Sequence, residues 1–535
     1  MSTTFLKFRS VSANRIILIC ALWLTLFTNL TYFQKVLEVY ELNAANSGFL
    51  LAIVLLQFSL IGLLLSLFGV KYLIKTLLII VLLSAASSAY FMQTFGVVID
   101  EDMIRNTLQT NPAEASDLLT INFVATVALL GVLPALWVLL TPIHWKSPGK
   151  ETLSRIKLIV LMMLLTVACL GLFYKPFASF FREHKPIRFY SNPLYMMYSS
   201  VKYISGDLID QSKIVNALGL DAHIPVDDTE RELIIFVVGE TARADHFSLN
   251  GYARKTNPLL EKEDVLNMPR MSSCGTSTAV SVPCMFSVLA QDQFSNKDAA
   301  QTENALDVLK HAGVNILWRD NNSSSKGVAD RVEYQSFQDP SVNPICDSEC
   351  RDIGMLSGLD DYIRNHPKVD ILIVLHQMGN HGPAYYKRYP PEFETFVPSC
   401  KTAQLEDCTQ QEISNAYDNA IVYTDYFLSE TIQFLKRYSS QFETALLYAS
   451  DHGESLGESG IYLHGLPLFI APDTQTHVAA FFWLGEHYDD IDRTAFQRIA
   501  TGPLTHDNLF HTLLGLFEVE SEVHDAEKDL LTSAH

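Results

Sequence analysis

The chain has 535 residues, of which 48% are hydrophobic and 18% are charged. This length exceeds that of a single small binding module, and this composition excludes a disordered or collagen-like chain. The net charge of −20 is unevenly distributed, because residues 1–175 carry +4 and the remainder carries −24. The chain is therefore predicted to have two physically different regions.

Five apolar stretches in the first region have the length of about 20 residues that a helix needs to cross a bilayer. They cover approximately 16–34, 47–69, 71–93, 119–141 and 155–174. A cleaved signal peptide is the alternative for the first stretch, but no small-residue cleavage site follows it. We therefore expect a transmembrane domain of five helices over residues 1–175.

Basic residues at alternate ends of these spans indicate their orientation. They precede the first span, follow the second and fill the connection before the fifth: Lys7, Arg9, Arg15, Lys71, Lys75, Lys146, Lys150, Arg155 and Lys157. The positive-inside rule makes these ends cytoplasmic. An odd number of spans then carries everything after Lys175 to the outside.

The cysteines test this topology independently. Cys20 and Cys169 lie inside predicted spans, and the other six fall in the second region, which fits an oxidising compartment. Their short separations favour three disulfides, Cys274–Cys284, Cys346–Cys350 and Cys400–Cys408. The second is the least secure, because only three residues separate its cysteines. A four-thiolate zinc site is the alternative, but the sequence has no C-x-x-C pair.

Residues 176–229 are predicted to bridge the two regions at the membrane surface. The stretch FASFFREHKPIRFYSNPLYMMYSSVKYI is rich in aromatic and basic residues, and such side chains suit the headgroup layer. A packed linker is the alternative. Either arrangement keeps the following domain close to the bilayer.

From about residue 230 to 535, apolar runs alternate with helical patterns. The runs are ELIIFVVGE, VNILWRD, VDILIVLHQMG, ETALLYASDHGE and HVAAFFWLG, and a helix is expected after Thr278. Runs of this kind are typical of strands buried on both faces, so we predict an α/β domain with a mostly parallel central sheet. In such sheets ligands bind beyond the carboxyl ends of the strands.

Acidic residues and histidines gather at those predicted strand ends. They are Glu240, His376, His381, Asp451, His452 and His464. A single histidine in such a place is more often structural, but carboxylates and imidazoles at successive strand ends form a ligand set that suits zinc.

A hydroxyl-rich turn precedes the expected helix and offers a nucleophile. A metal beside a hydroxyl at this turn would ease loss of its proton at neutral pH. The alternative is an ordinary helix N-cap. Spacing alone leaves Thr276, Ser277 and Thr278 all open.

The strings VVGETARADHFSLNGY, SCGTSTAVSVPCMFS, WRDNNSSSKG, HQMGNHGPAYYKRYP and YASDHGESLGESGIYLHGLP closely resemble the lipid A phosphoethanolamine transferases, including the mobile colistin-resistance enzymes. The resemblance runs nearly end to end. It implies the fold of the alkaline phosphatase and sulfatase superfamily behind a five-span anchor. It also implies a bacterial inner-membrane protein whose catalytic domain lies in the periplasm.

The resemblance assigns roles to individual residues. It implies Thr278 as the nucleophile and Glu240, Asp451 and His452 as its companions around one tightly bound zinc. Ser323, Lys326, His381 and His464 would contact the phosphoethanolamine group, and the two histidines would hold a possible second zinc.

The resemblance also points to the second external loop. Asn106, Thr110 and Glu114 recur there at four-residue intervals, so a helix would place them on one face, where they would contact the lipid headgroup. A solvated amphipathic loop is the alternative reading of this spacing.

The expected activity is transfer of phosphoethanolamine from phosphatidylethanolamine to a phosphate of lipid A, through a phosphothreonine-ethanolamine intermediate. Lys326, His381 and His464 would stabilise charge or, for the histidines, protonate the leaving group. Polymyxin resistance would follow, and we expect a monomer that binds no nucleic acid. Two related activities remain open: transfer to an inner-core sugar, and transfer of phosphoglycerol. A receptor with a structural metal is the non-enzymatic alternative.

Overall fold

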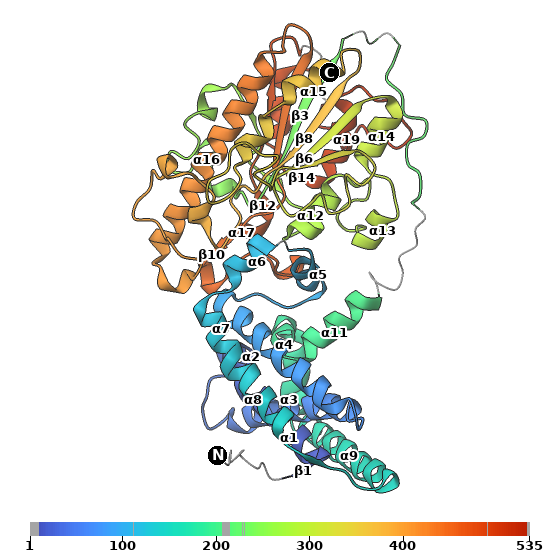
Figure 1. The fold of residues 1–535 in the computed structure, drawn as a ribbon, viewed down its shortest axis with the longest axis vertical. Coiled ribbons are helices and arrows are strands. Elements are labelled where there is room, and N and C mark those ends of the chain that lie inside the picture. The colour runs from blue at the N-terminus through green and yellow to red at the C-terminus, as the bar shows by residue number, and fades with distance from the viewer. Residues whose placement is uncertain are drawn as a thin grey trace, which may run out of the picture. The chain divides into compact units, whose positions relative to one another are not determined.

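The computed structural model describes residues 10–110, 112–205, 215–226, 228, 230–488 and 491–531, without side chains at 112–114. Its contacts divide the chain into two compact units (Figure 1). The membrane unit comprises Met1–Ile104 and Leu118–Ser205, and the α/β unit comprises Arg105–Asp117 and Gly206–His535. The chain therefore enters the α/β unit once, briefly, before it returns to the membrane unit. The domain boundaries near 175 and 230 stay a prediction.

The membrane unit is helical. Its helices are α1 Ala13–Phe27, α2 Leu30–Val39, α3 Ser47–Leu67, α4 Ile74–Phe95, α7 Ile121–Val127, α8 Leu133–Leu140, α9 Pro148–Leu172, α10 Tyr174–Glu183 and α11 Leu194–Tyr203. A π-helical turn, Ala128–Val132, joins α7 to α8. Strands β1 Val11–Ser12 and β2 Ile143–His144 pair in parallel.

Four helices in the described residues are long and apolar enough to cross a membrane: 47–67, 74–95, 121–140 and 148–172. The pair α1 and α2 makes a fifth span only if it is counted as one element, because it bends by 54°. At the bend, Asn29 is buried and its amide donates to the Leu24 carbonyl at 2.9 Å and to the Asn192 carbonyl at 2.6 Å. A side chain that bonds helix carbonyls in this way competes with the regular helical pattern. The count of five spans thus stays a prediction.

The α/β unit is built on a seven-stranded sheet with the order β4-β13-β9-β3-β8-β6-β7. The strands are β3 Glu232–Gly239, β4 Leu266–Asn267, β6 Asn315–Asp320, β7 Glu333–Ser336, β8 Ile371–His376, β9 Glu443–Ser450 and β13 Ala480–Leu484. Strands β9, β3, β8, β6 and β7 are parallel to one another, whereas β13 is antiparallel to both β9 and β4. The sheet is therefore mixed, and the expectation of a mostly parallel sheet describes only its part from β9 to β7.

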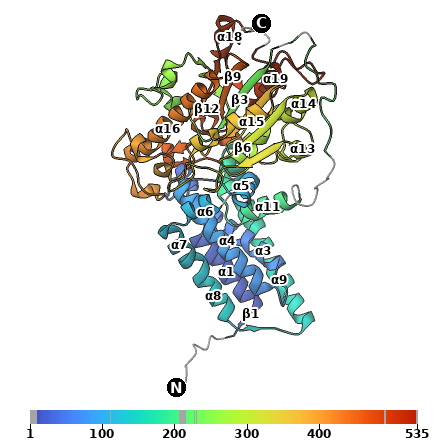
Figure 2. The same cartoon turned by 45° about the horizontal axis from the view of Figure 1, so that its top comes forward.

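Helices cover both faces of this sheet. In Figures 1 and 2, α16 Gln410–Lys436 lies on one side of the strands, and α14 Ala305–Ala312 and α19 Leu509–Gly515 lie on the other. Alternate residues of β3, among them Phe236, join one buried core with Leu309 of α14 and Leu513 of α19. A central strand buried on both faces needs apolar residues at every position, which explains the uninterrupted run in β3.

Shorter elements complete the α/β unit. They are α5 Glu101–Gln109, which starts in the membrane unit, α6 Pro112–Leu118, α12 Thr278–Met285, α13 Asn296–Ala300, α15 Leu359–Asn365, α17 Asp473–Thr476, α18 Arg493–Ala500, β5 Met271–Ser272, β10 Ser455–Leu456, β11 Tyr462–Leu463, β12 His477–Val478 and β14 Leu504–Thr505. Strands β12, β5 and β14 form a second small sheet, and β10 pairs with β11.

The register of the central strands brings their carboxyl ends together. Val238 of β3 is opposite His376 of β8, and Gly239 of β3 is opposite Ser450 of β9. Residues that follow β3 and β9 therefore leave the sheet side by side, at the edge where ligands bind in folds of this kind.

Candidate active site

Glu240, Asp451 and His452 meet at the carboxyl ends of β3 and β9. Each can offer one ligand atom, these atoms lie within 4.8 Å of one another, and all three side chains are fully buried. His452 Nε2 lies 3.4 Å from Glu240 Oε1 and 3.4 Å from Asp451 Oδ2. Two carboxylates and an imidazole in this arrangement can hold a divalent metal ion such as zinc.

Thr278 is the hydroxyl of the turn that meets this group. It begins helix α12, and its Oγ1 donates to Glu240 Oε2 at 3.0 Å and lies 3.3 Å from His452 Nε2. Thr276 Oγ1 instead donates to the Leu466 carbonyl at 2.6 Å. Ser277 Oγ is buried and makes no hydrogen bond within the described residues, so it does not cap the helix. The geometry thus separates three hydroxyls that spacing alone could not.

The group brings two buried carboxylates, those of Glu240 and Asp451, close together. Asp451 Oδ1 accepts from the amides of Thr241 and His452 at 3.1 and 2.7 Å, whereas Oδ2 is buried and accepts no hydrogen bond within the described residues. Burial and then the nearby charge of Glu240 raise the pKa of Asp451 well above its usual range. Burial also opposes ionisation of Glu240, but its electrostatic interactions with His452, His381 and His464 outweigh this effect and lower the pKa of Glu240. A buried carboxylate pair, one oxygen of which accepts no hydrogen bond within the described residues, fits a metal ligand set.

The backbone around Glu240 is held in an unusual conformation. Thr241 has a φ of 58°, which is rare for a β-branched residue. Its amide donates to Asp451, its hydroxyl donates to Glu240 Oε1, and its carbonyl accepts from Tyr417 Oη at 2.7 Å. Gly379, with a φ of 50°, approaches so closely that a Cβ there would lie 2.8 Å from the Glu240 carbonyl oxygen. Such local strain persists where the surroundings fix it, and it is frequent at functional sites.

Asn322 is a further residue of the site, which the sequence patterns did not indicate. Its amide donates to Glu240 Oε2 at 2.8 Å and to the Gln377 carbonyl at 2.7 Å, and it is buried. It follows β6 by two residues and precedes Ser323 directly. Two other signals in the sequence point to Asn322. It lies at a strand end, and it belongs to the string WRDNNSSSKG, which also contains the predicted site residues Ser323 and Lys326.

Ser323 and Lys326 lie together on the same loop. Lys326 Nζ donates to Ser323 Oγ at 2.6 Å and to the Ser323 carbonyl at 3.2 Å. Lys326 has a φ of 52° and Ser324 one of 102°, so two non-glycine residues of this loop adopt the left-handed conformation. An ammonium and a hydroxyl held together in this way suit an anionic group of a substrate.

His381 and His464 lie next to each other and to the ligand group. The ring centroid of His464 is 4.3 Å from that of His452 and 5.4 Å from that of His381. Glu454, fully buried, binds His464 Nδ1 through Oε2 at 2.8 Å and accepts from Tyr385 Oη through Oε1 at 2.6 Å. Because Nδ1 is occupied, Nε2 is the nitrogen of His464 that remains for a substrate or metal.

His376 has a different partner from the other predicted strand-end residues. Its Nδ1 lies 3.0 Å from Asp320 Oδ2 at the end of β6, and both side chains are fully buried. Burial lowers the pKa of His376, but the Asp320 carboxylate outweighs this effect and leaves it raised. The pair joins the ends of two strands next to the site.

Comparisons with known proteins agree with this geometry. Residues 232–519 match the sulfatase family model, and residues 57–208 match the model described as phosphoethanolamine transferase EptA/EptB. Phosphatidylethanolamine transferase Mcr-1 of Escherichia coli is 44% identical over 528 residues, which cover 96% of each chain. Phosphoethanolamine transferase EptA of Escherichia coli K12 is 39% identical over 543 residues, 99% of this chain and 98% of that one. The chain belongs to the phosphoethanolamine transferase family.

A solved structure supports the same conclusion for the whole chain. The integral membrane lipooligosaccharide phosphoethanolamine transferase A from Neisseria meningitidis matches with a TM-score of 0.94 at 32% identity, and the match covers 98% of this chain and 100% of that one. Like that protein, this phosphoethanolamine transferase is an integral membrane protein with a soluble, sulfatase-like C-terminal domain.

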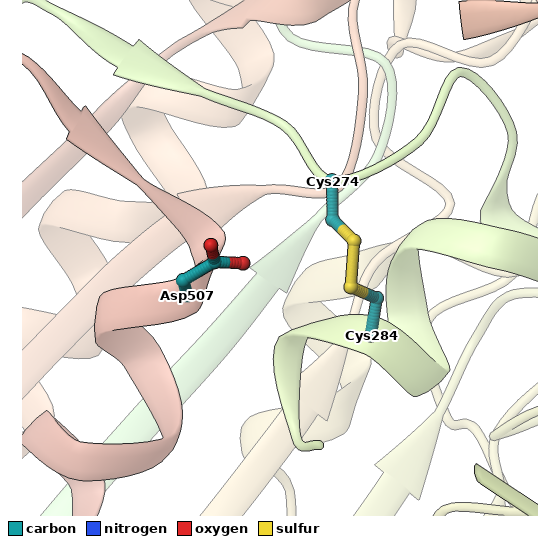
Figure 3. Close-up of side chains that lie close together, drawn as sticks. All are labelled: Cys274, Cys284 and Asp507. Atoms are coloured by element: carbon teal, nitrogen blue, oxygen red, sulfur yellow. A yellow bond between two sulfur atoms is a disulfide. The ribbon is translucent and has the colours of Figure 1, made fainter. Parts of the chain in front are cut away.

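Three disulfides stabilise the soluble part of this transferase. They are Cys274–Cys284, Cys346–Cys350 and Cys400–Cys408, the pairs favoured by their spacing. Cys274 and Cys284 also lie near Asp507, but their sulfurs are bonded to each other, as Figure 3 shows, so this cluster offers no thiolates to a metal. The bond instead ties the turn before Thr278 to the end of α12. Cys20 and Cys169 are free and buried.

The predicted headgroup residues do not share one helix. Asn106 lies in α5, which ends at Gln109, and a new helix, α6, begins at Pro112. Proline lacks the amide that a continuing helix needs but suits a helix start, so the expected single face is interrupted. Thr110 Oγ1 donates to the Asn106 carbonyl at 2.7 Å. Glu114 lies in α6, and its side chain falls outside the described residues.

Proposed function

We propose that this protein transfers phosphoethanolamine from phosphatidylethanolamine to a phosphate of lipid A, through a covalent intermediate on Thr278. The observation that carries the proposal is the position of Thr278 Oγ1, 3.0 Å from Glu240 Oε2 and 3.3 Å from His452 Nε2 in a buried group of potential metal ligands. Membership of the phosphoethanolamine transferase family supports the transferred group.

Glu240, Asp451, His452 and Thr278 would hold one zinc ion. The residues fit it, because the donor set combines carboxylates and an imidazole and because Asp451 Oδ2 lacks a hydrogen-bond partner within the described residues. When bound, zinc would supply positive charge that favours ionisation of a neighbouring hydroxyl and stabilises charge on a phosphoryl group. A second zinc near His381 and His464 is part of the same proposal.

In the first half-reaction, Thr278 Oγ1 attacks the phosphorus of phosphatidylethanolamine. The Thr278 proton is directed at Glu240 Oε2, which already accepts it in a hydrogen bond. A bond forms between Oγ1 and phosphorus, the bond from phosphorus to the diacylglycerol oxygen breaks, and that oxygen takes up a proton. In the absence of a second zinc, His464 or His381 would donate this proton, and Lys326 with Ser323 would bind the phosphoryl oxygens.

In the second half-reaction, a phosphate oxygen of lipid A attacks the same phosphorus, the bond from phosphorus to Thr278 Oγ1 breaks, and Oγ1 takes back the proton held by Glu240. Both substrates are lipids, so an enzyme anchored in their plane searches a local rather than a bulk volume. The catalytic domain would therefore lie on the periplasmic side of the inner membrane, and a monomer would suffice. The added ammonium would offset phosphate charge on lipid A and weaken attraction of cationic polymyxins.

Intact-protein mass spectrometry tests the intermediate. The full chain in phosphatidylethanolamine vesicles should gain one phosphoethanolamine group, and peptide mapping should place it on Thr278. The adduct should not form after zinc is removed by a chelator, and it should return when zinc is restored. An adduct on another residue, or adduct formation without metal, would contradict the proposal.

The acceptor needs a separate measurement, because one similar protein is named Kdo(2)-lipid A phosphoethanolamine 7''-transferase of Escherichia coli and is 26% identical over 551 residues. Expression of the full chain should raise the mass of lipid A itself. If lipid A is unchanged and a core sugar carries phosphoethanolamine, the proposed acceptor is wrong but the proposed donor reaction stands. If phosphoglycerol is incorporated instead, both the proposed donor and the proposed transferred group are wrong.

A further inference from the structure

The α/β unit includes a short segment, residues 105–117, that lies in the sequence between helices of the membrane unit. This segment carries Asn106 and Thr110, two of the predicted headgroup residues. It is attached to the rest of the α/β unit at both of its ends, and both attachments lead to residues beside the candidate site.

The first attachment starts at Arg105, which is buried. The oxygen and nitrogen of the Asn296 side-chain amide are assigned from their neighbours, with the amide turned so that both are satisfied. In that orientation Arg105 Nη1 donates to the Asn296 oxygen at 2.8 Å, and the Asn296 nitrogen donates to the Ala279 carbonyl at 3.0 Å. Ala279 directly follows Thr278. One intermediate side chain therefore links the start of the segment to the helix that presents the nucleophile.

The second attachment starts at Asp117. Its carboxylate binds Lys387 Nζ and accepts from Arg388 Nη2 at 3.2 Å. Only 2% of the Arg388 side chain and 5% of the Asp117 side chain are exposed. Arg388 Nη1 donates to both oxygens of Glu349 at 2.6 Å, and Nε donates to the His381 carbonyl at 2.7 Å. One planar guanidinium thus joins three segments in fixed relative directions, which a flexible ammonium does not do.

The Cys346–Cys350 loop secures this guanidinium. Glu349 lies inside the loop, and so does Asp347, which pairs with Arg351 at 2.5 Å. Arg351 Nη1 in turn donates to the Lys387 carbonyl at 2.6 Å. The disulfide loop therefore contacts Arg388 directly through Glu349 and supports Lys387 indirectly, through the Asp347–Arg351 pair.

We propose that Arg388 is a positioning residue, which fixes the His381 main chain and the end of the headgroup-binding segment 105–117 in one arrangement, with the Cys346–Cys350 loop as its support. The inference rests on the proposed function. Arg388 would thus act on headgroup binding through the residues that it positions. Glu240 of the metal group is held by other residues, Thr241 and Asn322.

The test measures diacylglycerol release by the full chain at varied phosphatidylethanolamine concentration. Arg388→Lys and Asp117→Asn should each raise KM by about tenfold, the size expected for loss of one hydrogen bond between charged groups, while zinc content stays close to that of the unchanged chain. Arg388→Lys should also lower kcat, because it removes the hydrogen bond to the carbonyl of His381, a proposed proton donor, whereas Asp117→Asn should leave kcat nearly unchanged. The effect of the double variant on KM should be smaller than the product of the two single effects, because both changes break the Asp117–Arg388 contact. Replacing Cys346 and Cys350 by Ser should change KM in the same direction.

Arg331→Lys is the matched control. Arg331 pairs with the buried Asp307 at 2.6 Å in the same unit, and neither residue contacts segment 105–117 or the candidate site in the described structure. An equal rise of KM in this control, or an unchanged KM in both Arg388→Lys and Asp117→Asn, would overturn the inference. Asp117→Asn decides alone if Arg388→Lys fails to fold.

Hydrogen exchange separates this inference from the proposed function. Peptides that cover residues 105–117 and 378–384 should exchange faster in Arg388→Lys but not in Arg331→Lys, whether or not the chain is active. Absence of diacylglycerol release and of a Thr278 adduct in the unchanged chain would refute the proposed function. Unaltered exchange of both peptides would refute the role of Arg388.

Discussion

Replacement of Asn322 tests how far the metal group depends on its hydrogen-bonded surroundings. Asn322 donates to Glu240 Oε2 at 2.8 Å, and the hydroxyls of Thr278 and Thr241 donate to the same carboxylate. Asn322→Leu keeps the volume and removes the donor. A hydrogen bond to a charged group contributes about 1.5–3 kcal/mol, and loss of such a partner to a metal ligand typically lowers metal affinity about 10- to 100-fold.

We therefore expect the zinc dissociation constant of the full chain to rise about 10- to 100-fold in Asn322→Leu, which corresponds to about 1.4–2.7 kcal/mol. Competition with a chromogenic zinc chelator measures it. The transfer rate at limiting zinc should fall, and excess zinc should restore most of it, because Thr278 and its ligands remain.

Asn419→Leu is the matched control for this measurement. Asn419 is fully buried and its amide donates to the Phe396 carbonyl at 2.9 Å, so its replacement by Leu likewise keeps the volume and removes buried hydrogen bonds, without touching Glu240. A zinc affinity of Asn322→Leu within about twofold of the unchanged chain, or an equal loss in Asn419→Leu, would refute the reasoning.

Three further predictions concern the same unit. Thr278→Val should abolish the covalent adduct and lipid A modification while circular dichroism and thermal unfolding show a folded chain; residual adduct would show another nucleophile. Burial lowers the pKa of His506 to about 3, whereas the unfolded side chain has a pKa of about 6.5, so only the unfolded chain binds this proton between those values. Stability should be full above about pH 6.5 and fall on acidification toward pH 3, by up to about 1.4 kcal/mol per pH unit. His506→Gln, which can keep the contacts to the Cys274 amide and the Ser450 carbonyl, should reduce that pH dependence in acid-unfolding curves, and an unchanged curve would contradict it. Replacing Cys274 and Cys284 by Ser opens a loop with a sequence separation of 10, so the chain-entropy model predicts a loss of about 2.7 kcal/mol, visible as a lower midpoint of thermal unfolding; a midpoint equal to that of the unchanged chain would argue against it.

Local patterns in the sequence predicted much of this architecture. The apolar run of β3 identified a buried strand, and residues directly after strands, such as Glu240 and Asp451, were expected at one edge because parallel strands share that edge. Close cysteine spacing similarly favoured the three disulfides. These features depend on neighbours along the chain, and so they can be predicted from the sequence alone.

Other features depend on contacts between distant segments. The antiparallel placement of β13 follows from its partners β9 and β4, and no local periodicity reports strand direction. Asn322 and Arg388 are ordinary polar residues in the sequence, and their roles arise only from partners 82 and 271 positions away. Four-residue spacing alone suggested one helix through Asn106, Thr110 and Glu114, but the proline at 112 starts a new one.

The interleaving of the two units along the chain has a consequence for any attempt to separate them. A fragment cut after the last membrane helix would retain Glu240, Thr278, Asp451 and His452 but would lose residues 105–117, which group with them. A chimera made by a single genetic crossover near residue 210 would combine this segment from one parent with Arg388 from the other. We expect such chimeras to be most active when one parent supplies an aspartate at position 117 and the other an arginine at position 388, so that the contact between them is kept.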